Sequence, residues 1–458
     1  MKYVSTRGRV EPISFKDAVM MGLAEDGGLL VPAEVPKLTG ADMERLRNLS
    51  YPELAYEIVS LFTDDIEPEK LRDIINRSYK VFDTEEVIPV VKKNGIYIAE
   101  IFHGPTYAFK DIALQFLGNL FEHILQERDQ QLNIIGATSG DTGSAAIAGV
   151  RGRKNINIFI LHPEGRVSPV QEMQMTSVPD ENVFNLAVEG TFDDCQYIVK
   201  SIFADLDFKR QHSLGAVNSI NWARVLAQIV YYFHAYFRAA ENGEKIRFVV
   251  PTGNFGNIFA GYFAKLMGLP IEKLILATNE NNILSRFIMA GDYTLQDVVA
   301  THSPSMDIQL ASNLERYLYF LYEKDTERIN RLMETLKQEK GIKFPEADVK
   351  KVQEEIDTYS VTNDETVGVI RDFYNETGYV LDPHTACGVK AGLVHKEEFK
   401  TVCLSTAHPA KFPDVVRDAI GEDPDKPEGI KRIEGLEKRK VSIDNDIEKV
   451  KAYIADNV

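Results

Sequence analysis

Short runs of β-branched and aliphatic residues alternate with stretches of helical periodicity over most of the chain after residue 87. Such alternation is typical of parallel βαβ units, in which a helix connects each strand to the next. It therefore predicts a doubly wound α/β body, in which ligands bind beyond the carboxyl ends of the strands. The expected strands are Leu132–Gly136, Ile156–Leu161, Val183–Val188, Ile246–Val250, Leu274–Thr278 and Thr401–Leu404.

Composition divides the chain into three expected segments. Residues 1–88 carry amphipathic stretches without this alternation and are expected to form an N-terminal module. Residues 89–424 hold the α/β body, which we expect to consist of two subdomains. Residues 425–458 are strongly charged and helical in pattern, which is typical of a solvated face. The amphipathic stretches of the first segment are Phe15–Leu23, Tyr51–Leu61 and Leu71–Tyr79.

Two glycine-rich loops follow expected strands. The first, Gly136–Ser144, precedes a helix expected from Ala145 and offers backbone N–H groups and hydroxyls that can cradle an anion. The second, Pro251–Asn257, precedes an expected helix Ile258–Met267, and its glycines let the backbone approach a phosphate. Neither loop has a Walker ending or the GxGxxG spacing, so neither alone identifies its ligand.

A lysine lies at the start of another predicted helix. Apolar residues recur at helical spacing over 107–126, and Lys110 falls in the first turn. The helix dipole and the unpaired N–H groups there favour an anion, and therefore the neutral amine over the ammonium. The apolar neighbours Phe109 and Ile112 add desolvation in the same direction. Lys110 is thus a candidate nucleophile, the alternative being an ordinary surface lysine.

The last expected strand leads into Cys403–Phe412, where the hydroxyl of Thr406 is the candidate functional group. A hydroxyl in this place can hydrogen-bond to a bound heterocycle. It can equally bond its own backbone in a local turn.

Charge and cysteine content exclude several classes of function. Among 458 residues, Lys plus Arg number 52 and Asp plus Glu 69, so the net charge is −17 and polyanions are repelled. We therefore expect no nucleic-acid partner. No apolar stretch is long enough to span a membrane and no apolar region follows the basic N-terminus, so we expect a cytoplasmic protein without a membrane partner. The three cysteines and the histidines are scattered, which predicts neither disulfides nor a metal site.

Four motifs together resemble the threonine synthase family, and they occur in the family's order between residue 3 and about residue 415. The chain is similar to the longer branch of that family, found in fungi and enterobacteria. The resemblance implies a fold type II pyridoxal phosphate enzyme, similar to the tryptophan synthase β subunit. It also implies a lyase of threonine biosynthesis that converts O-phospho-L-homoserine and water to L-threonine and phosphate. The motifs are Tyr3–Gly8, His103–Asp111, Thr138–Ala146 and Gly253–Asn257.

The same resemblance implies roles for individual residues. Lys110 would carry pyridoxal 5'-phosphate and move protons during catalysis, and Thr406 would face the pyridine nitrogen. The cofactor phosphate would bind to Gly253, Asn254, Phe255, Gly256 and Asn257. The substrate carboxylate would bind to Thr138, Ser139, Gly140, Asp141 and Thr142. Candidates for binding the substrate phosphate are Ser5, Arg7, Ser139 and Lys411.

Other functions would use similar loops. Within the same fold, a serine or threonine dehydratase, or a phospholyase that forms 2-oxobutyrate, differs little in these motifs. From another class, a nucleotide-binding regulator could hold ATP in the glycine-rich loops, but no GK[ST] ending is present. The N-terminal module and the sequence TSGDTG at residues 138–143 favour the synthase. A monomer and a dimer are both compatible with the sequence.

Overall fold

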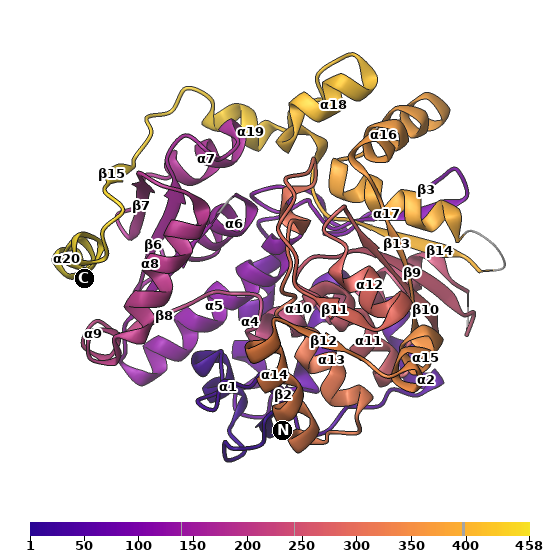
Figure 1. The fold of residues 1–458 in the computed structure, drawn as a ribbon, viewed down its shortest axis with the longest axis horizontal. Helices are drawn as coiled ribbons and strands as arrows, with labels where there is room; N and C mark the ends of the chain where they lie inside the picture. The colour runs from indigo at the N-terminus through magenta and orange to yellow at the C-terminus, as the bar shows by residue number, and fades with distance from the viewer. Residues whose placement is uncertain (139, 242, 396–398) are drawn as a thin grey trace. The chain divides into compact units, whose positions relative to one another are not determined.

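The computed structural model describes residues 1–138, 140–241, 243–395 and 399–458 (Figure 1). Contacts divide the chain into two compact units. The large unit consists of Met1–Arg72, Asp83–His103 and Ser219–Asp425. The small unit consists of Asp73–Phe82, Gly104–Asn218 and Lys426–Val458. Across the described residues, each helix is too short or too polar to cross a membrane.

The large unit is built on a six-stranded sheet with the order β13-β10-β9-β14-β4-β3. Neighbouring strands are parallel except for the antiparallel pair β3 and β4. The three strands predicted in this part of the chain are confirmed as β9, β10 and β14. The strands are β3 (Val90–Lys93), β4 (Ile96–Glu100), β9 (Ile246–Pro251), β10 (Ile271–Thr278), β13 (Ile356–Ser360) and β14 (Thr401–Ser405).

Helices cover both faces of this sheet. Successive residues of a strand point to opposite faces, and the ring of Phe248 in β9 packs on Tyr232 of α10 (Trp222–Ala239), with ring centroids 5.0 Å apart. Its neighbour Val249 lies in a buried cluster with Cys387 of α17 (Pro383–Val394) and with Phe373 of α16 (Asn363–Thr377). The sheet is therefore buried on both faces, as a doubly wound body requires.

The N-terminal residues pack within the large unit. Strands β1 (Tyr3–Ser5) and β2 (Leu30–Pro32) form an antiparallel pair. Tyr3 is fully buried and donates its hydroxyl to the Phe62 carbonyl at 2.8 Å. The predicted helices are confirmed within three residues as α1 (Phe15–Met21), α3 (Tyr51–Ser60) and α4 (Pro68–Tyr79). The residues of α4 from Asp73 on belong to the small unit. The large unit also contains α2 (Gly40–Arg47), α11 (Gly256–Met267), α12 (Ile283–Ala290), β11 (Asp292–Thr294), η1 (Pro304–Met306), α13 (Leu314–Leu321), α14 (Thr326–Glu339), β12 (Gly341–Lys343), α15 (Glu346–Glu355), η2 (Pro409–Lys411) and α18 (Pro413–Ile420).

The small unit is built on a five-stranded sheet with the order β15-β7-β6-β5-β8, in which all neighbours are parallel. The three predicted strands are confirmed, and β7 has the predicted bounds. Helices α5 and α6 pack together, and α8 covers a buried cluster that includes residues of β5, β6 and β7. The strands are β5 (Leu132–Ala137), β6 (Ile156–Pro163), β7 (Val183–Val188), β8 (Leu214–Gly215) and β15 (Val441–Ile443). The helices are α5 (Lys110–Arg128), α6 (Asp141–Val150), α7 (Pro169–Thr176), α8 (Phe192–Ala204), α9 (Leu206–Gln211), α19 (Glu428–Ile433) and α20 (Ile447–Asp456).

The charged C-terminal segment contributes to the core of the small unit. Strand β15 forms an edge of its sheet by pairing with β7. Val450 and Ile454 of α20 are fully buried in the cluster beneath α8, and Ile430 of α19 is also fully buried. The interpretation of this segment as a solvated face is therefore wrong for these residues, because a few apolar side chains at helical spacing anchor an otherwise charged stretch.

Candidate active site

Lys110 is the first helical residue of α5, and its predicted place in the first turn is confirmed. The helix begins three residues later than predicted. The reason is the backbone of Tyr107, whose φ of 60° lies in the left-handed region and cannot continue a right-handed helix. The turn from Gly104 to Phe109 therefore precedes the helix and sets its first residue.

Asp111 fixes this turn. Its carboxylate is fully buried and accepts hydrogen bonds from the backbone N–H of Thr106 at 2.7 Å and from the Thr106 hydroxyl at 2.8 Å. A Cβ atom on Gly104 would lie 2.3 Å from the Cβ of Asp111, so only glycine fits there. Asp111 is thus a positioning residue for the start of α5.

Replacement of Asp111 by alanine is expected to destabilise the protein by about 3 kcal/mol, because it leaves the buried Thr106 donors without these partners. Asp111→Asn keeps one acceptor oxygen and should lose less. Urea unfolding of the three proteins measures both effects. Equal midpoints for the alanine variant and the parent protein would show that the carboxylate does not hold the turn.

The amine of Lys110 lies 3.9 Å from a carboxylate oxygen of Asp141, and only 12% of the Lys110 side chain is exposed. Asp141 is itself buried and accepts a hydrogen bond from the Gln171 amide at 2.8 Å. The loop after β5 therefore presents a fixed anion to the lysine. Gln171 carried no signal in the sequence, because it lies 30 positions from its partner.

Helix α6 begins at Asp141, four residues before the predicted Ala145. Thr138 accounts for the difference, because its hydroxyl oxygen accepts hydrogen bonds from the N–H groups of Gly140 at 3.0 Å and Gly143 at 2.9 Å. These bonds cap the helix from outside its first turn. Asp141 and Thr142 are thus helical, Gly140 is the cap residue, and Ser139 lies outside the described residues.

In the large unit, the loop after β9 has a constrained backbone. Phe255 is buried and has a φ of 63°, so the chain reverses directly before α11. Asn313 holds the loop, because its backbone N–H donates to the Asn254 carbonyl at 3.0 Å and its side-chain amide donates to the same carbonyl at 3.2 Å. A Cβ atom on Gly256 would meet that amide nitrogen at 3.2 Å, and one on Gly253 would meet the Ser305 carbonyl at 2.9 Å.

The hydrogen bonds of the Asn257 side chain indicate whether this loop can bind an anion. Its side-chain oxygen accepts hydrogen bonds from the hydroxyls of Tyr231 at 2.5 Å and Tyr232 at 3.0 Å. Its amide nitrogen is buried without a hydrogen-bond partner among the described residues. Buried donors are normally paired, and this one lies in the first turn of α11, where anions are stabilised. The loop therefore offers an unsatisfied donor at a helix start, which is a feature of anion-binding loops.

Thr406 directly follows β14, which is the parallel neighbour of β9. The carboxyl ends of these two strands meet at one edge of the sheet, which brings Thr406 and the Gly253–Asn257 loop to the same edge. The backbone N–H of Thr406 donates to the hydroxyl oxygen of Thr385 at 3.1 Å, and that hydroxyl donates to Asp382. Asp382 thus holds the backbone of Thr406 in place through the Thr385 hydroxyl. Asp382 was not predicted from the sequence.

The candidates for binding the substrate phosphate have different surroundings. Ser5 is buried and donates its hydroxyl to Asp26 at 2.7 Å. The guanidinium of Arg7 donates to both carboxylate oxygens of Glu315, at 3.2 and 3.1 Å. Carboxylates therefore engage both side chains. Lys411 is fully buried in η2, five residues after Thr406.

His384 and His408 make structural hydrogen bonds. His384 accepts a hydrogen bond from the backbone N–H of Ser305 at 3.1 Å and pairs with Asp382 at 3.0 Å. His408 accepts one from the N–H of Ala410 at 3.1 Å. Among the described residues, no three His, Cys, Asp or Glu side chains are grouped so as to hold a metal ion.

Three family models match successive parts of the chain. Residues 2–79 match the N terminus of threonine synthase, and residues 385–454 match the C-terminal part of threonine synthase. Residues 85–402, which overlap the start of the C-terminal match, match the pyridoxal-phosphate dependent enzymes.

Full-length relatives agree with these matches. The chain is 47% identical to threonine synthase of Eremothecium gossypii and 46% identical to that of Saccharomyces cerevisiae, over 100% of this chain and 98% of each relative. A crystal structure of PLP-bound threonine synthase from Brucella melitensis has a TM-score of 0.97 at 44% identity, covering 100% of this chain and 99% of that one. The yeast threonine synthase structure has a TM-score of 0.95 at 44% identity, covering 100% and 98%. The predicted fold type II architecture is confirmed, and the chain belongs to the threonine synthase family of pyridoxal phosphate-dependent enzymes.

Proposed function

We propose that this protein converts O-phospho-L-homoserine and water to L-threonine and phosphate. The observation that carries the proposal is the match of both terminal segments to threonine synthase, since the general enzyme model covers only the body between them. The net charge of −17 supports a protein without nucleic-acid partners. We further propose a cytoplasmic monomer or dimer, organised as an N-terminal module (1–88), a catalytic body (89–424) and a C-terminal segment (425–458).

We assign the contacts to the cofactor residue by residue. Lys110 carries pyridoxal phosphate, the loop Gly253–Asn257 binds its phosphate, and Thr406 donates or accepts a hydrogen bond at the pyridine nitrogen. The side-chain nitrogen of Asn257, which has no hydrogen-bond partner in the part of the chain that the structure describes, supports the phosphate assignment. When bound, the cofactor withdraws electrons from the substrate and so eases removal of protons from Cα and Cβ.

The chain's own groups supply proton transfer and orientation. The amine of Lys110 removes protons from Cα and Cβ and delivers protons to Cγ and Cα, while phosphate leaves Cγ and water adds to Cβ. Asp141 orients this amine across their 3.9 Å separation. The stretch Thr138–Thr142, whose last two residues begin α6, binds the substrate carboxylate. For the substrate phosphate, Ser5, Arg7, Ser139 and Lys411 remain the proposed ligands.

Product analysis tests the proposed function. The purified holoenzyme is incubated with O-phospho-L-homoserine, and phosphate, threonine and 2-oxobutyrate are measured together. We expect one threonine for each phosphate released. Release of 2-oxobutyrate in the same ratio would instead identify a phospholyase, and ATP binding without turnover would identify a nucleotide-binding regulator.

Substitution of Gly256 by valine is expected to weaken cofactor binding at least about tenfold, or about 1.4 kcal/mol. The added atoms meet the Asn313 amide, at 3.2 Å already from the Cβ position, and push the loop away from its phosphate-binding geometry. Equilibrium dialysis of pyridoxal phosphate measures the effect.

Gly40→Ala serves as the control for this variant, because a Cβ atom there meets nothing within 4 Å. It should bind the cofactor as the parent protein does. Unchanged affinity in Gly256→Val would remove the loop from the cofactor site.

Substitution of Thr406 tests the ring contact. A neutral hydroxyl does not stabilise a protonated pyridine nitrogen as a carboxylate does, which favours elimination and replacement over transamination. Thr406→Ala should cost about 1 kcal/mol in cofactor affinity. Thr406→Asp should raise the ratio of pyridoxamine phosphate to threonine among the products. An unchanged ratio in Thr406→Asp would contradict the assignment.

A further inference from the structure

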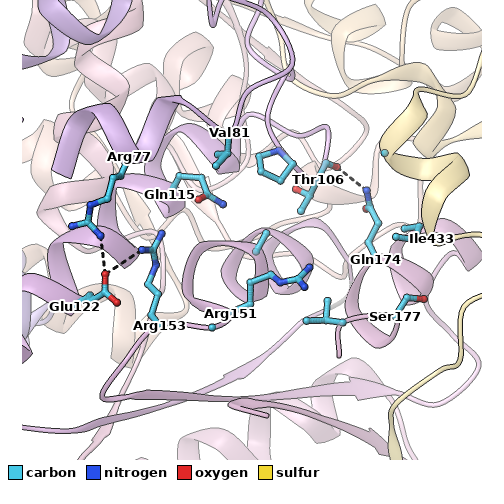
Figure 2. Close-up of a pocket in the computed structure, with 15 residues that line it drawn as sticks. Arg77, Val81, Thr106, Gln115, Glu122, Arg151, Arg153, Gln174, Ser177 and Ile433 are labelled. Carbon is cyan, nitrogen blue, oxygen red and sulfur yellow. Dashed lines mark hydrogen bonds and ion pairs between the residues drawn. The ribbon is translucent and has the colours of Figure 1, made fainter. Parts of the chain in front are cut away.

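The small unit contains a cavity of about 510 Å³ that the proposed chemistry does not use (Figure 2). Its walls come from the end of α4, from α5, from the segment that follows α6, from α7 and from α19. This volume lies within the range of small-molecule sites, about 300 to 1,000 Å³. Apolar side chains, including Val81, Val178 and Ile433, alternate with polar ones around it.

Three arginines line this cavity, together with a single carboxylate, Glu122. Glu122 lies 2.9 Å from the guanidinium of Arg77 and 3.5 Å from that of Arg153. Burial lowers the pKa of Arg153, and the charge of Arg77 lowers it further while Glu122 opposes the shift. One carboxylate is thus shared between two partly buried cations.

The third arginine, Arg151, pairs with Asp180 at 2.5 Å, and Asp180 does not line the cavity. Figure 2 shows the Arg151 side chain extending among the other lining residues, between Arg153 and Gln174. A guanidinium has five N–H donors in a planar fork, so an arginine with one carboxylate partner keeps donors for an oxyanion.

Gln115 supplies an independent indication of a ligand. It is only 3% exposed, and its amide nitrogen has no hydrogen-bond partner among the described residues. Figure 2 shows the amide pointing from α5 toward the space between Val81 and Thr106. A buried donor without an acceptor is costly, and a ligand oxygen would satisfy it.

We propose that this cavity binds a small oxyanion metabolite, with its charged group on Arg151 and a second oxygen on the Gln115 amide. Pro105 and Thr106 also line the cavity. The carbonyl of Thr106 accepts a hydrogen bond from Gln174 at 3.0 Å, and its N–H donates to Asp111, which adjoins Lys110. A ligand in the cavity therefore acts on the turn that positions Lys110, and the site is an effector site; this last step rests on the proposed function.

Calorimetric titration of the holoenzyme with inorganic phosphate and, separately, with succinate tests the binding. The two probes distinguish a phosphate group from a pair of carboxylates. The variants are Arg151→Gln and Gln115→Leu, and the control is Arg210→Gln, a surface arginine in α9 outside the cavity. We expect at least one probe to bind the parent protein and the control, and to bind each cavity variant at least tenfold more weakly.

Turnover measured with and without the bound probe then tests the coupling. We expect basal turnover of Arg151→Gln to match the parent. Succinate, which is not a product of the proposed reaction, should change the parent's turnover at least twofold but not the variant's. Failure of both probes to bind, or equal binding to parent and cavity variants, would overturn the site. These binding results stand whichever product the enzyme forms, so failure of the site and failure of the proposed function are distinguishable.

Discussion

Replacement of Lys110 by alanine is expected to lower turnover by at least about 10³-fold, because it removes the proton-transferring amine and the attachment point of the cofactor together. Visible absorbance from the lysine-bound cofactor should disappear in the same variant. Stopped assays of threonine formation and an absorption spectrum of the purified protein measure the two effects. The fold should survive, since Lys110 is the first residue of α5 and contributes little to the core.

Two further variants make this result specific. Lys110→Arg keeps a positive charge near Asp141 but provides no usable nucleophile, so it should be as inactive as the alanine variant. Lys154→Ala, which removes an exposed lysine of the small unit, should retain full activity. Substantial turnover in Lys110→Arg would mean that charge, and not the amine, is what this position contributes.

Replacement of Gly118 by alanine is expected to cost at least about 3 kcal/mol of stability, because it overpacks a backbone contact between two helices. A Cβ atom at Gly118 in α5 would lie 1.9 Å from the carbonyl oxygen of Gly149 in α6. A Cβ atom at Gly149 would lie 2.5 Å from the carbonyl oxygen of Leu114 in α5. The two helices can approach this closely only because residues 118 and 149 are both glycine. Urea unfolding measures the loss.

The same pair of helices carries Lys110 and Asp141 at their first residues, so Gly118→Ala should also reduce turnover at temperatures where the variant is folded. Gly368→Ala is the matched control. It lies inside α16 with only the end of Arg371 nearby, at 3.7 Å, and should raise stability by up to about 1 kcal/mol through helix propensity. Equal stability of Gly118→Ala and the parent would show that the helices can separate without penalty.

Hydrophobic runs predicted the central strands well. A strand that is buried on both faces is apolar at every position, so it stands out in the sequence as a continuous run. Strands at the edges were harder. The hairpin of β3 and β4 was not predicted, although Asn94 and Gly95, with φ of 44° and 77°, form the Asn-Gly turn that often joins such strands. Strand β15 has only three residues and exposes two of them, so only its pairing with β7 defines it.

The local sequence predicted that Lys110 lies in the first turn of a helix, but it could not predict the residue at which that helix begins. That depends on the left-handed backbone of Tyr107 and on Asp111 reaching back to Thr106. The start of α6 depends in the same way on the hydroxyl of Thr138.

Residues that hold the site from a distance could not be predicted at all. Asn313 secures the Asn254 carbonyl from 59 positions away, and Glu315 engages Arg7 from 308 positions away. Neither belongs to a motif, and only the folded chain brings each to its partner.

Mapping the lysine that carries the cofactor tests the central claim most directly. The holoenzyme is treated with borohydride to make the cofactor linkage permanent, digested, and its labelled peptide sequenced by mass spectrometry. We predict a single pyridoxyl group on Lys110, in the peptide that contains Phe109 and Asp111. A label on any other lysine of the chain would contradict the assignment.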